Sequence, residues 1–168
     1  MSRCVAMKPP FDDVVRTHGA TVLRVCRAVV GPHDADDAWS ETFLAAMRHY
    51  PRLPDDANTR AWLVTIAHRK SIDITRARKR RPIAVDEVPE RADTTAGAEG
   101  HAELWRAVER LPLRQRQAVA YRYLGGLAYK DIAALMGGTD ASVRRAAADG
   151  VAALRAAFNA ASNTGATR

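Results

Sequence analysis

Apolar side chains recur at helical spacing through the first half of the chain. The pattern predicts three helices, over residues 12–30, 34–50 and 59–80. Residues 51–58 contain two prolines and predict a loop, and Asn58 or Thr59 can cap the helix that follows. In the second helix we expect one apolar stripe to face the core, formed by Trp39, Phe43, Met47 and Tyr50.

The second half repeats the helical pattern in shorter segments, which predict helices over residues 103–110, 113–124, 127–136 and 140–158. The last two resemble a helix-turn-helix, because a small residue, a turn glycine and a β-branched residue follow one another as Ala133, Gly137 and Val143. In such a unit the start of the second helix enters the major groove. Two helices that pack for structural reasons alone are the other interpretation of this pattern.

The composition agrees with an all-α fold, because alanine and arginine are abundant while aromatic residues make up only 6%. Residues 82–101 contain prolines, glycines and acidic residues without a hydrophobic period, which is typical of a flexible linker. We therefore expect two small helical domains, at residues 10–81 and 102–158, the second ending in the helix-turn-helix. Residues 1–9 and 159–168 are expected to be disordered tails.

The formal net charge of +7 indicates an anionic partner, either nucleic acid or a membrane surface. The two basic halves flank the acidic linker, since residues 1–81 carry +6, residues 82–101 carry −4 and residues 102–168 carry +5. No apolar run approaches the roughly 20 residues of a membrane span, and Met1–Pro10 lacks the apolar core of a signal peptide. We expect a cytoplasmic protein without membrane insertion. The two cysteines, Cys4 and Cys26, imply no disulfide framework.

Two local charge clusters carry more information than the net charge. Residues 69–81 hold seven basic residues against Asp73, and folding does not require such a concentration, so phosphate binding is favoured over a merely solvated face. The start of the second helix is acidic through Asp34, Asp37 and Glu41. That face is either solvated or a docking surface for a basic protein.

An enzyme is disfavoured by the motifs. The chain has no glycine-rich phosphate loop, no HExxH and no CxxC, and its five histidines lack metal-ligand spacing. We therefore expect no catalytic residues, metal or cofactor. A membrane-surface helix is disfavoured too, because the basic cluster lacks an adjoining face of Trp, Phe or Leu.

Four stretches, in this order, resemble bacterial RNA polymerase sigma factors of the extracytoplasmic-function (ECF) group: DADDAWSETFL at 34–44, RAWLVTIAHRKSIDITR at 60–76, LPLRQRQ at 111–117 and YLGGLAYKDIA at 123–133. The resemblance implies a region 2 domain at residues 10–81 and a region 4 domain at 102–158. It also implies a protein that binds core RNA polymerase and directs promoter recognition, DNA melting and transcription initiation. Such factors are often held by an anti-sigma partner.

The resemblance assigns residues to three surfaces. Core polymerase would bind Asp34, Asp37 and Glu41. The −10 element, as duplex and as melted single strand, would meet Asp55, Asp56, Asn58, Arg60, Trp62, Arg69, Lys70, Arg76, Lys79 and Arg80. The −35 element would meet Lys130, Ser142, Arg144 and Arg145.

The chain departs from the family pattern in three places. Arg69 stands where asparagine is frequent, and Ala128 stands where a capping serine is common. In the last helix, Asp149 would repel phosphate and Gly150 costs a helix up to about 1 kcal/mol, so −35 binding is expected to depend on few contacts. The alternative function is a sigma-like helix-turn-helix regulator or polymerase competitor that does not initiate by itself.

Overall fold

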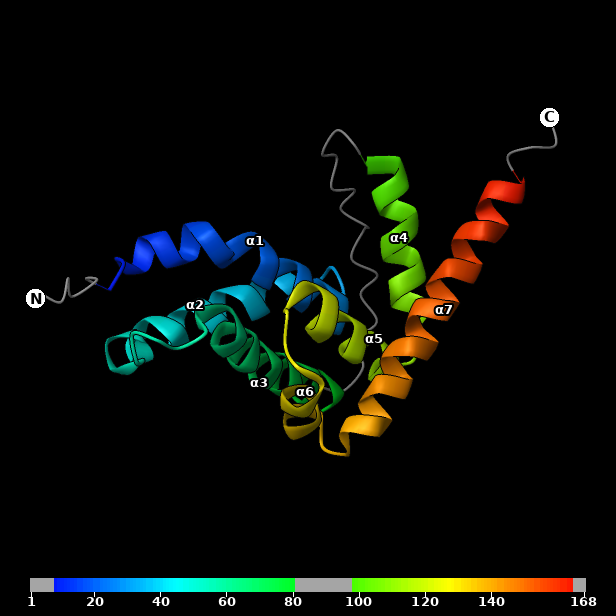
Figure 1. The fold of residues 1–168 in the computed structure, drawn as a ribbon. Coiled ribbons are helices and arrows are strands. Elements are labelled where there is room, and N and C mark those ends of the chain that lie inside the picture. The colour runs from blue at the N-terminus through cyan, green and yellow to red at the C-terminus, as the bar shows by residue number, and fades with distance from the viewer. Residues whose placement is uncertain (1–7, 81–97, 165–168) are drawn as a thin grey trace, which may run out of the picture.

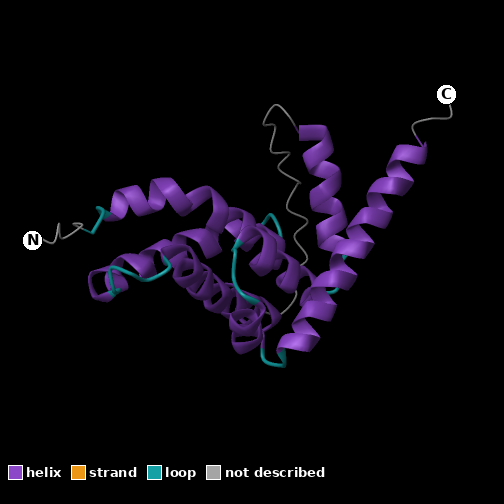
Figure 2. Cartoon of the chain, viewed as in Figure 1, coloured by secondary structure: helices purple, strands orange, loops and turns teal. Residues whose placement is uncertain are grey.

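The computed structural model describes residues 8–80 and 98–164, and every regular element within these ranges is helical (Figures 1 and 2). The first range holds three α-helices and a short 3₁₀ turn: α1 (Phe11–Val30), α2 (Ala35–His49), η1 (Tyr50–Arg52) and α3 (Thr59–Arg80). The second range holds α4 (Ala98–Arg110), α5 (Leu113–Val119), η2 (Ala120–Leu124), α6 (Tyr129–Met136) and α7 (Asp140–Thr164). The all-α prediction is confirmed for the described residues.

The helices α1, α2 and α3 pack around one apolar cluster that includes Val22, Phe43 and Leu63. Trp39 and Phe43 belong to the predicted core stripe, and their rings lie 4.7 Å apart. The prediction is wrong for Met47, which is 51% exposed. The buried stripe of α2 continues through Thr42, Ala46 and Tyr50, and Met47 lies beside this stripe, so its side chain meets solvent rather than the core.

The helix predicted over residues 113–124 changes its geometry halfway, because α5 continues into the π-helical turn η2. The Gly125 amide donates to the Ala120 carbonyl at 2.9 Å, which is the wider spacing of a π turn. A Cβ at Gly125 would lie 2.8 Å from the Tyr121 carbonyl and 3.2 Å from Val64 Cγ1. Only glycine therefore allows this turn to close against α3.

The helix-turn-helix is formed by α6 and α7. Gly137 ends α6 with φ = 70°, which places it in the left-handed region expected for the turn glycine. Val143, the β-branched residue of the motif, is fully buried. Phe158, near the end of α7, is 39% exposed and lines a surface pocket together with residues of α4.

The two halves of the chain share a second core cluster. Val25, Val29 and Val64 from the first half pack with Tyr121, Leu127 and Ile132 from the second. A hydrogen bond of 2.7 Å joins His68 Nδ1 and the Tyr121 hydroxyl across the interface. The guanidinium of Arg27 lies 4.8 Å from the Trp105 ring centroid, which adds a cation–π contact. The domains are therefore packed together, which the sequence pattern did not predict.

The structure also bears on the expected linker and tails. The predicted linker at 82–101 lies outside the described residues, apart from the stretch where α4 begins at Ala98. Lys8 and Pro9, from the predicted N-terminal tail, contact Tyr50. The last helix reaches Thr164, beyond the expected boundary at 158. No helix of the described residues is long and apolar enough to cross a membrane.

Candidate protein and nucleic-acid interfaces

The acidic face of α2 is formed by its first two turns. Asp37 and Glu41 are exposed and lie four residues apart, so both carboxylates project from the same side of the helix. Asp34 occupies the N-cap position but makes no capping hydrogen bond, because its carboxylate accepts one from Arg78 at 3.0 Å instead. Leu44 continues the face and is 48% exposed. The surface therefore offers negative charge next to an apolar side chain.

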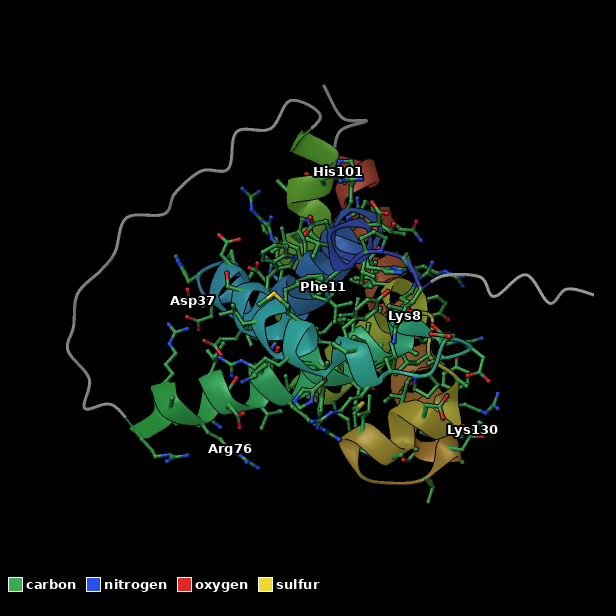
Figure 3. The ribbon with its side chains drawn as sticks, turned by 90° about the vertical axis from the view of Figure 1, so that its left-hand side faces the viewer. Lys8, Phe11, Asp37, Arg76, His101 and Lys130 are labelled. Carbon is green, nitrogen blue, oxygen red and sulfur yellow. The ribbon has the colours of Figure 1, made fainter. Side chains whose placement is uncertain are left out.

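The basic half of α3 lies beside this acidic face. Lys70 pairs with Glu41 at 3.4 Å, and Arg78 pairs with Asp34. In Figure 3 Asp37 and Arg76 project from the same side of the molecule. The remaining predicted cations are exposed and have no ion-pair partner within the described ranges: Arg69, Arg76, Lys79 and Arg80. Exposed ion pairs of this kind are worth at most about 1 kcal/mol each, so both pairs can exchange for stronger partners.

The loop before α3 is held at its end by a cap. The Asn58 side-chain oxygen accepts a hydrogen bond from the Ala61 amide at 3.1 Å, as the sequence predicted for this position. Asp55 and Asp56 are exposed in the middle of the loop. Trp62 is half-buried, and its ring lies 6.4 Å from that of Tyr50.

A pocket of about 420 Å³ adjoins the loop and bridges the two halves of the chain. Asn58 and Arg60, both predicted −10 contacts, line it together with His18 and with Gly126 of the second half. A Cβ at Gly126 would lie 3.4 Å from the Arg60 guanidinium. The second half therefore lies directly against part of the predicted −10 surface.

The turn of the helix-turn-helix is fixed by a reciprocal cap. The Ser142 hydroxyl accepts from the Thr139 amide at 3.1 Å, and the Thr139 hydroxyl accepts from the Ser142 amide at 3.2 Å. Arg114 of α5 donates to the Ser142 hydroxyl and to the Gly137 carbonyl. Ser142, a predicted −35 contact, is thus already engaged in capping α7.

The predicted reading residues at the start of α7 are exposed and oriented by their neighbours. The guanidinium of Arg144 lies 4.6 Å from the Tyr129 ring centroid, and that of Arg122 lies 4.8 Å from the same ring. Arg144 also pairs with Asp140 at 3.2 Å. Arg145 and Lys130 are exposed, and Lys130 lies on α6 well away from Arg76 (Figure 3).

Sequence reasoning missed the residues that position these groups. Arg114 lies within the quoted stretch at 111–117, but nothing in the spacing indicated its bonds to a turn 23 residues later. Tyr129 lies in the stretch at 123–133. Its contacts with Arg122 of η2 and Arg144 of α7 depend on how these elements pack around α6. Asp149 is exposed, whereas Gly150 is buried against α5.

The buried titratable groups stay neutral. Burial raises the pKa of Cys26 to about 12, so its thiol remains protonated and unreactive at neutral pH. Burial likewise raises the pKa of Tyr121 and lowers that of His68, and Arg69 lowers the His68 pKa further. Within the described residues, no three His, Cys, Asp or Glu side chains form a group that could hold a metal ion.

Comparison with protein families gives two matches that divide the chain between them. The Sigma-70 region 2 family matches residues 14–81. The Sigma-70 region 4 family matches residues 101–154. The two matched segments contain the acidic face of α2, the basic half of α3 and the helix-turn-helix.

Three relatives with similar sequences are all ECF RNA polymerase sigma factors. The ECF RNA polymerase sigma factor SigM of Mycobacterium tuberculosis is 32% identical over 136 residues, which cover 80% of this chain and 69% of that protein. SigD of Mycobacterium bovis is 34% identical, covering 79% of this chain and 69% of its own length. ShbA of Streptomyces griseus is 31% identical and covers 80% of both chains.

Two solved structures share the fold. CnrH, solved with the cytosolic domain of CnrY, has a TM-score of 0.62 at 23% identity and covers 89% of this chain and 88% of its own. RpoE of Bartonella quintana, solved with the anti-sigma factor NepR, has a TM-score of 0.65 at 19% identity, covering 88% and 98%. Family matches, relatives and fold agree that this chain belongs to the ECF group of RNA polymerase sigma factors, which direct promoter-specific transcription initiation.

Proposed function

We propose that this sigma factor divides its task among three surfaces. The acidic face of α2 binds core RNA polymerase, the loop at 53–58 with the basic half of α3 engages the −10 element, and the start of α7 reads the −35 element. The observation that carries the proposal is the separation of charge within one chain. The acidic face of α2 lies beside the basic half of α3 and apart from the cations of the helix-turn-helix. The first two surfaces belong to the region 2 match and the third to the region 4 match.

Charge complementarity supports the polymerase contact. Asp37 and Glu41 are exposed on a protein whose net charge is +7, so the charge of this face is opposite in sign to the net charge of the protein. A basic partner helix would be drawn to it, and Leu44 would supply apolar area within the contact.

The −10 surface combines a loop with free cations. Extruding a base from the duplex costs a few kcal/mol, which backbone contacts and a base-binding site must offset. Arg69, Arg76, Lys79 and Arg80 are exposed and available for phosphates, while Asn58 and Arg60 line a pocket beside the loop. These residues would hold the melted strand while the loop captures a base.

The chain itself has no catalytic role in this proposal. The polymerase carries out the chemistry, and the sigma factor acts as a non-enzymatic DNA-binding subunit in the cytoplasm, without a cofactor. An anti-sigma factor is a further expected partner, because CnrH and RpoE, which share the fold, were each solved with a bound protein.

Run-off transcription with purified core polymerase tests the proposal. We expect this chain to direct specific transcripts from genomic fragments of its source, and sequencing of their 5′ ends will define the two promoter elements. A chain that binds core polymerase but yields no specific start would contradict the assignment as an initiating factor.

A further inference from the structure

The loop at 53–58 is tied to the segment that precedes α1. Lys8 donates hydrogen bonds from its ammonium to the carbonyl of Tyr50, at 2.6 Å, and to the carbonyl of Leu53. The same ammonium lies 4.6 Å from the centroid of the Tyr50 ring. In return, the Tyr50 hydroxyl donates to the Pro9 carbonyl at 2.7 Å. Four contacts therefore join two residues of the N-terminal segment to the entrance of the loop, and Figure 3 shows Lys8 on that side.

The Lys8 contacts lie where the backbone leaves α2 and enters the loop. After α2 ends, the 3₁₀ turn η1 closes with a backbone bond from the Leu53 amide to the Tyr50 carbonyl at 3.1 Å. Pro54 follows and has no amide proton to continue the turn. A cation is favoured at the carbonyl end of a helix, and Lys8 supplies it to the carbonyl of Tyr50, the first residue of η1, and to that of Leu53, which follows η1.

Tyr50, the residue that Lys8 contacts, is packed among aromatic side chains. Tyr50 is buried, and its ring lies 5.3 Å from Phe11 and 6.4 Å from Trp62. Lys8 therefore couples the loop entrance to the aromatic core of α1, α2 and α3. The exit of the loop is fixed separately by the Asn58 cap on α3 and by the bond from the Ala57 amide to the Pro54 carbonyl.

We propose that Lys8 is a positioning residue for promoter recognition: it clamps the entrance of the loop at 53–58, so that Asp55 and Asp56 are presented in one conformation to the −10 strand. This inference rests on the proposed function, since that function assigns the loop to the −10 element. Residues held in one geometry before binding lose less conformational freedom on binding, so the clamp would raise the preference for the correct bases.

The clamp is first tested in the free protein. Native-state hydrogen exchange of the Leu53 and Ala57 amides reports opening of the loop, and Lys8→Ala should speed it about tenfold. Tyr50→Phe, which removes only the bond to Pro9, should have a smaller effect in the same direction. Arg24→Ala, which removes an exposed positive charge elsewhere on α1, is the matched control and should change neither amide. Equal exchange in Lys8→Ala and the wild type would overturn the clamp, whatever the protein does with DNA.

The second test measures base preference in the holoenzyme. The probe is a fluorescent single strand that carries the −10 sequence found by transcript mapping, compared with a scrambled strand. Lys8→Ala should reduce the ratio of the two affinities several-fold, and Lys8→Arg should restore most of it, because a guanidinium can reach the same carbonyls. Binding of core polymerase and the melting temperature should match those of Arg24→Ala.

Salt dependence separates positioning from direct contact. A residue that only positions the loop leaves the slope of log affinity against log salt unchanged, whereas a lost phosphate contact lowers it by about 0.7 on a single strand. A lowered slope in Lys8→Ala, or an unchanged affinity ratio, would overturn the proposal. A wild-type holoenzyme that does not prefer the −10 strand would instead contradict the proposed function, even if the exchange result supports the clamp.

Discussion

At the scale of single residues, the departures from the family pattern in α7 have different meanings. Gly150 was expected only to weaken the helix, but a Cβ at this position would lie 2.7 Å from Val119 Cγ2 and 3.4 Å from Gln115 Cβ. The glycine therefore lets α7 approach α5 closely. Asp149 is exposed and makes no contribution of this kind to packing.

We predict that Gly150→Ala destabilises the protein, although alanine is the better helix former. The gain in helix propensity is about 1 kcal/mol, whereas overpacking a tight contact costs about 1–3 kcal/mol. Urea unfolding should show a net loss of roughly 1 kcal/mol, and Val119→Ala in the same chain should recover part of it. A higher unfolding midpoint for Gly150→Ala would show that α5 and α7 can separate freely.

Arg144 is held by its contact with the Tyr129 ring, which orients its guanidinium for the proposed −35 contact. Arg144→Ala should lose about 1–3 kcal/mol of discrimination at the −35 element if the guanidinium makes a bidentate base contact. Binding of matched and mutated −35 duplexes measures this directly, with Arg145→Ala as the neighbouring comparison. An equal loss on every sequence would make Arg144 a phosphate contact.

At the scale of elements, ion pairs join the two helices to which we assign different tasks. Lys70 and Arg78 of α3, the proposed −10 helix, pair with Glu41 and Asp34 of α2, the proposed polymerase-binding helix. Each pair is exposed and therefore weak. A basic polymerase helix that takes Asp34 and Glu41 would leave Lys70 and Arg78 available for DNA.

The double variant Asp37→Arg/Glu41→Arg should abolish binding to core polymerase, because it reverses the charge of the acidic face without touching the core. Asp12→Arg/Glu109→Arg makes the same change of charge on exposed residues elsewhere and serves as the control. Pull-down with core polymerase and circular dichroism measure binding and folding. Retained binding by the first variant, with its helix content intact, would refute the assignment of α2.

The cations of α3 should differ in their contribution to DNA affinity. Arg76 is exposed and has no ion-pair partner among the described residues, so Arg76→Ala should lower the salt slope of holoenzyme binding to a melted −10 strand by about 0.7. Arg24→Ala on α1 should leave the slope unchanged. If the slope is the same for wild type and Arg76→Ala, Arg76 remains in solvent.

The elements were largely predictable from the sequence because their signals are local. Asn58 caps α3, Gly137 ends α6, and the apolar periodicity locates the helices. The π turn at Ala120–Leu124 was not predictable, because it depends on how Gly125 meets Val64 of the other half. For the same reason the sequence located Arg144 and Ser142 but not Tyr129 and Arg114, which act on them through tertiary packing.

At the scale of the whole molecule, the two halves are packed more closely than the proposed binding of both promoter elements allows. The −10 and −35 elements are named for positions about 25 base pairs apart, which at a rise of about 3.4 Å per base pair is roughly 85 Å of duplex. In the structure, however, Gly126 of the second half lies in the pocket beside Arg60, and His68 bonds to Tyr121. Simultaneous binding of both elements therefore requires the halves to separate.

The separation should depend on pH through His68. Burial and Arg69 hold its pKa below the ordinary value of 6.5, and a hydrogen bond to the Leu135 backbone opposes them. The packed form thus binds fewer protons than the open form, so packing is fully stable above about pH 6.5 and weakens as the pH falls below that value. The radius of gyration from small-angle scattering should rise between pH 7.5 and 5.5 without loss of helical circular dichroism.

His68→Gln provides the control for this pH dependence, because it removes the titrating group at the interface. His18, whose pKa is also lowered by burial and by Arg60, remains in that variant. The expansion should therefore be much smaller in His68→Gln. An identical expansion in both proteins would assign the effect to His18 or to other groups.

The shared core has a consequence for competition over polymerase. When only the open form is competent, the apparent dissociation constant equals the intrinsic one divided by the open fraction. Val25 and Val64 lie in that core and are buried, so neither side chain is available to a partner in the packed form. Shortening either side chain to alanine would raise the open fraction. Such a variant would then capture polymerase at a lower cellular concentration, so buried residues outside the three proposed binding surfaces would set the threshold at which the promoters of this factor become active.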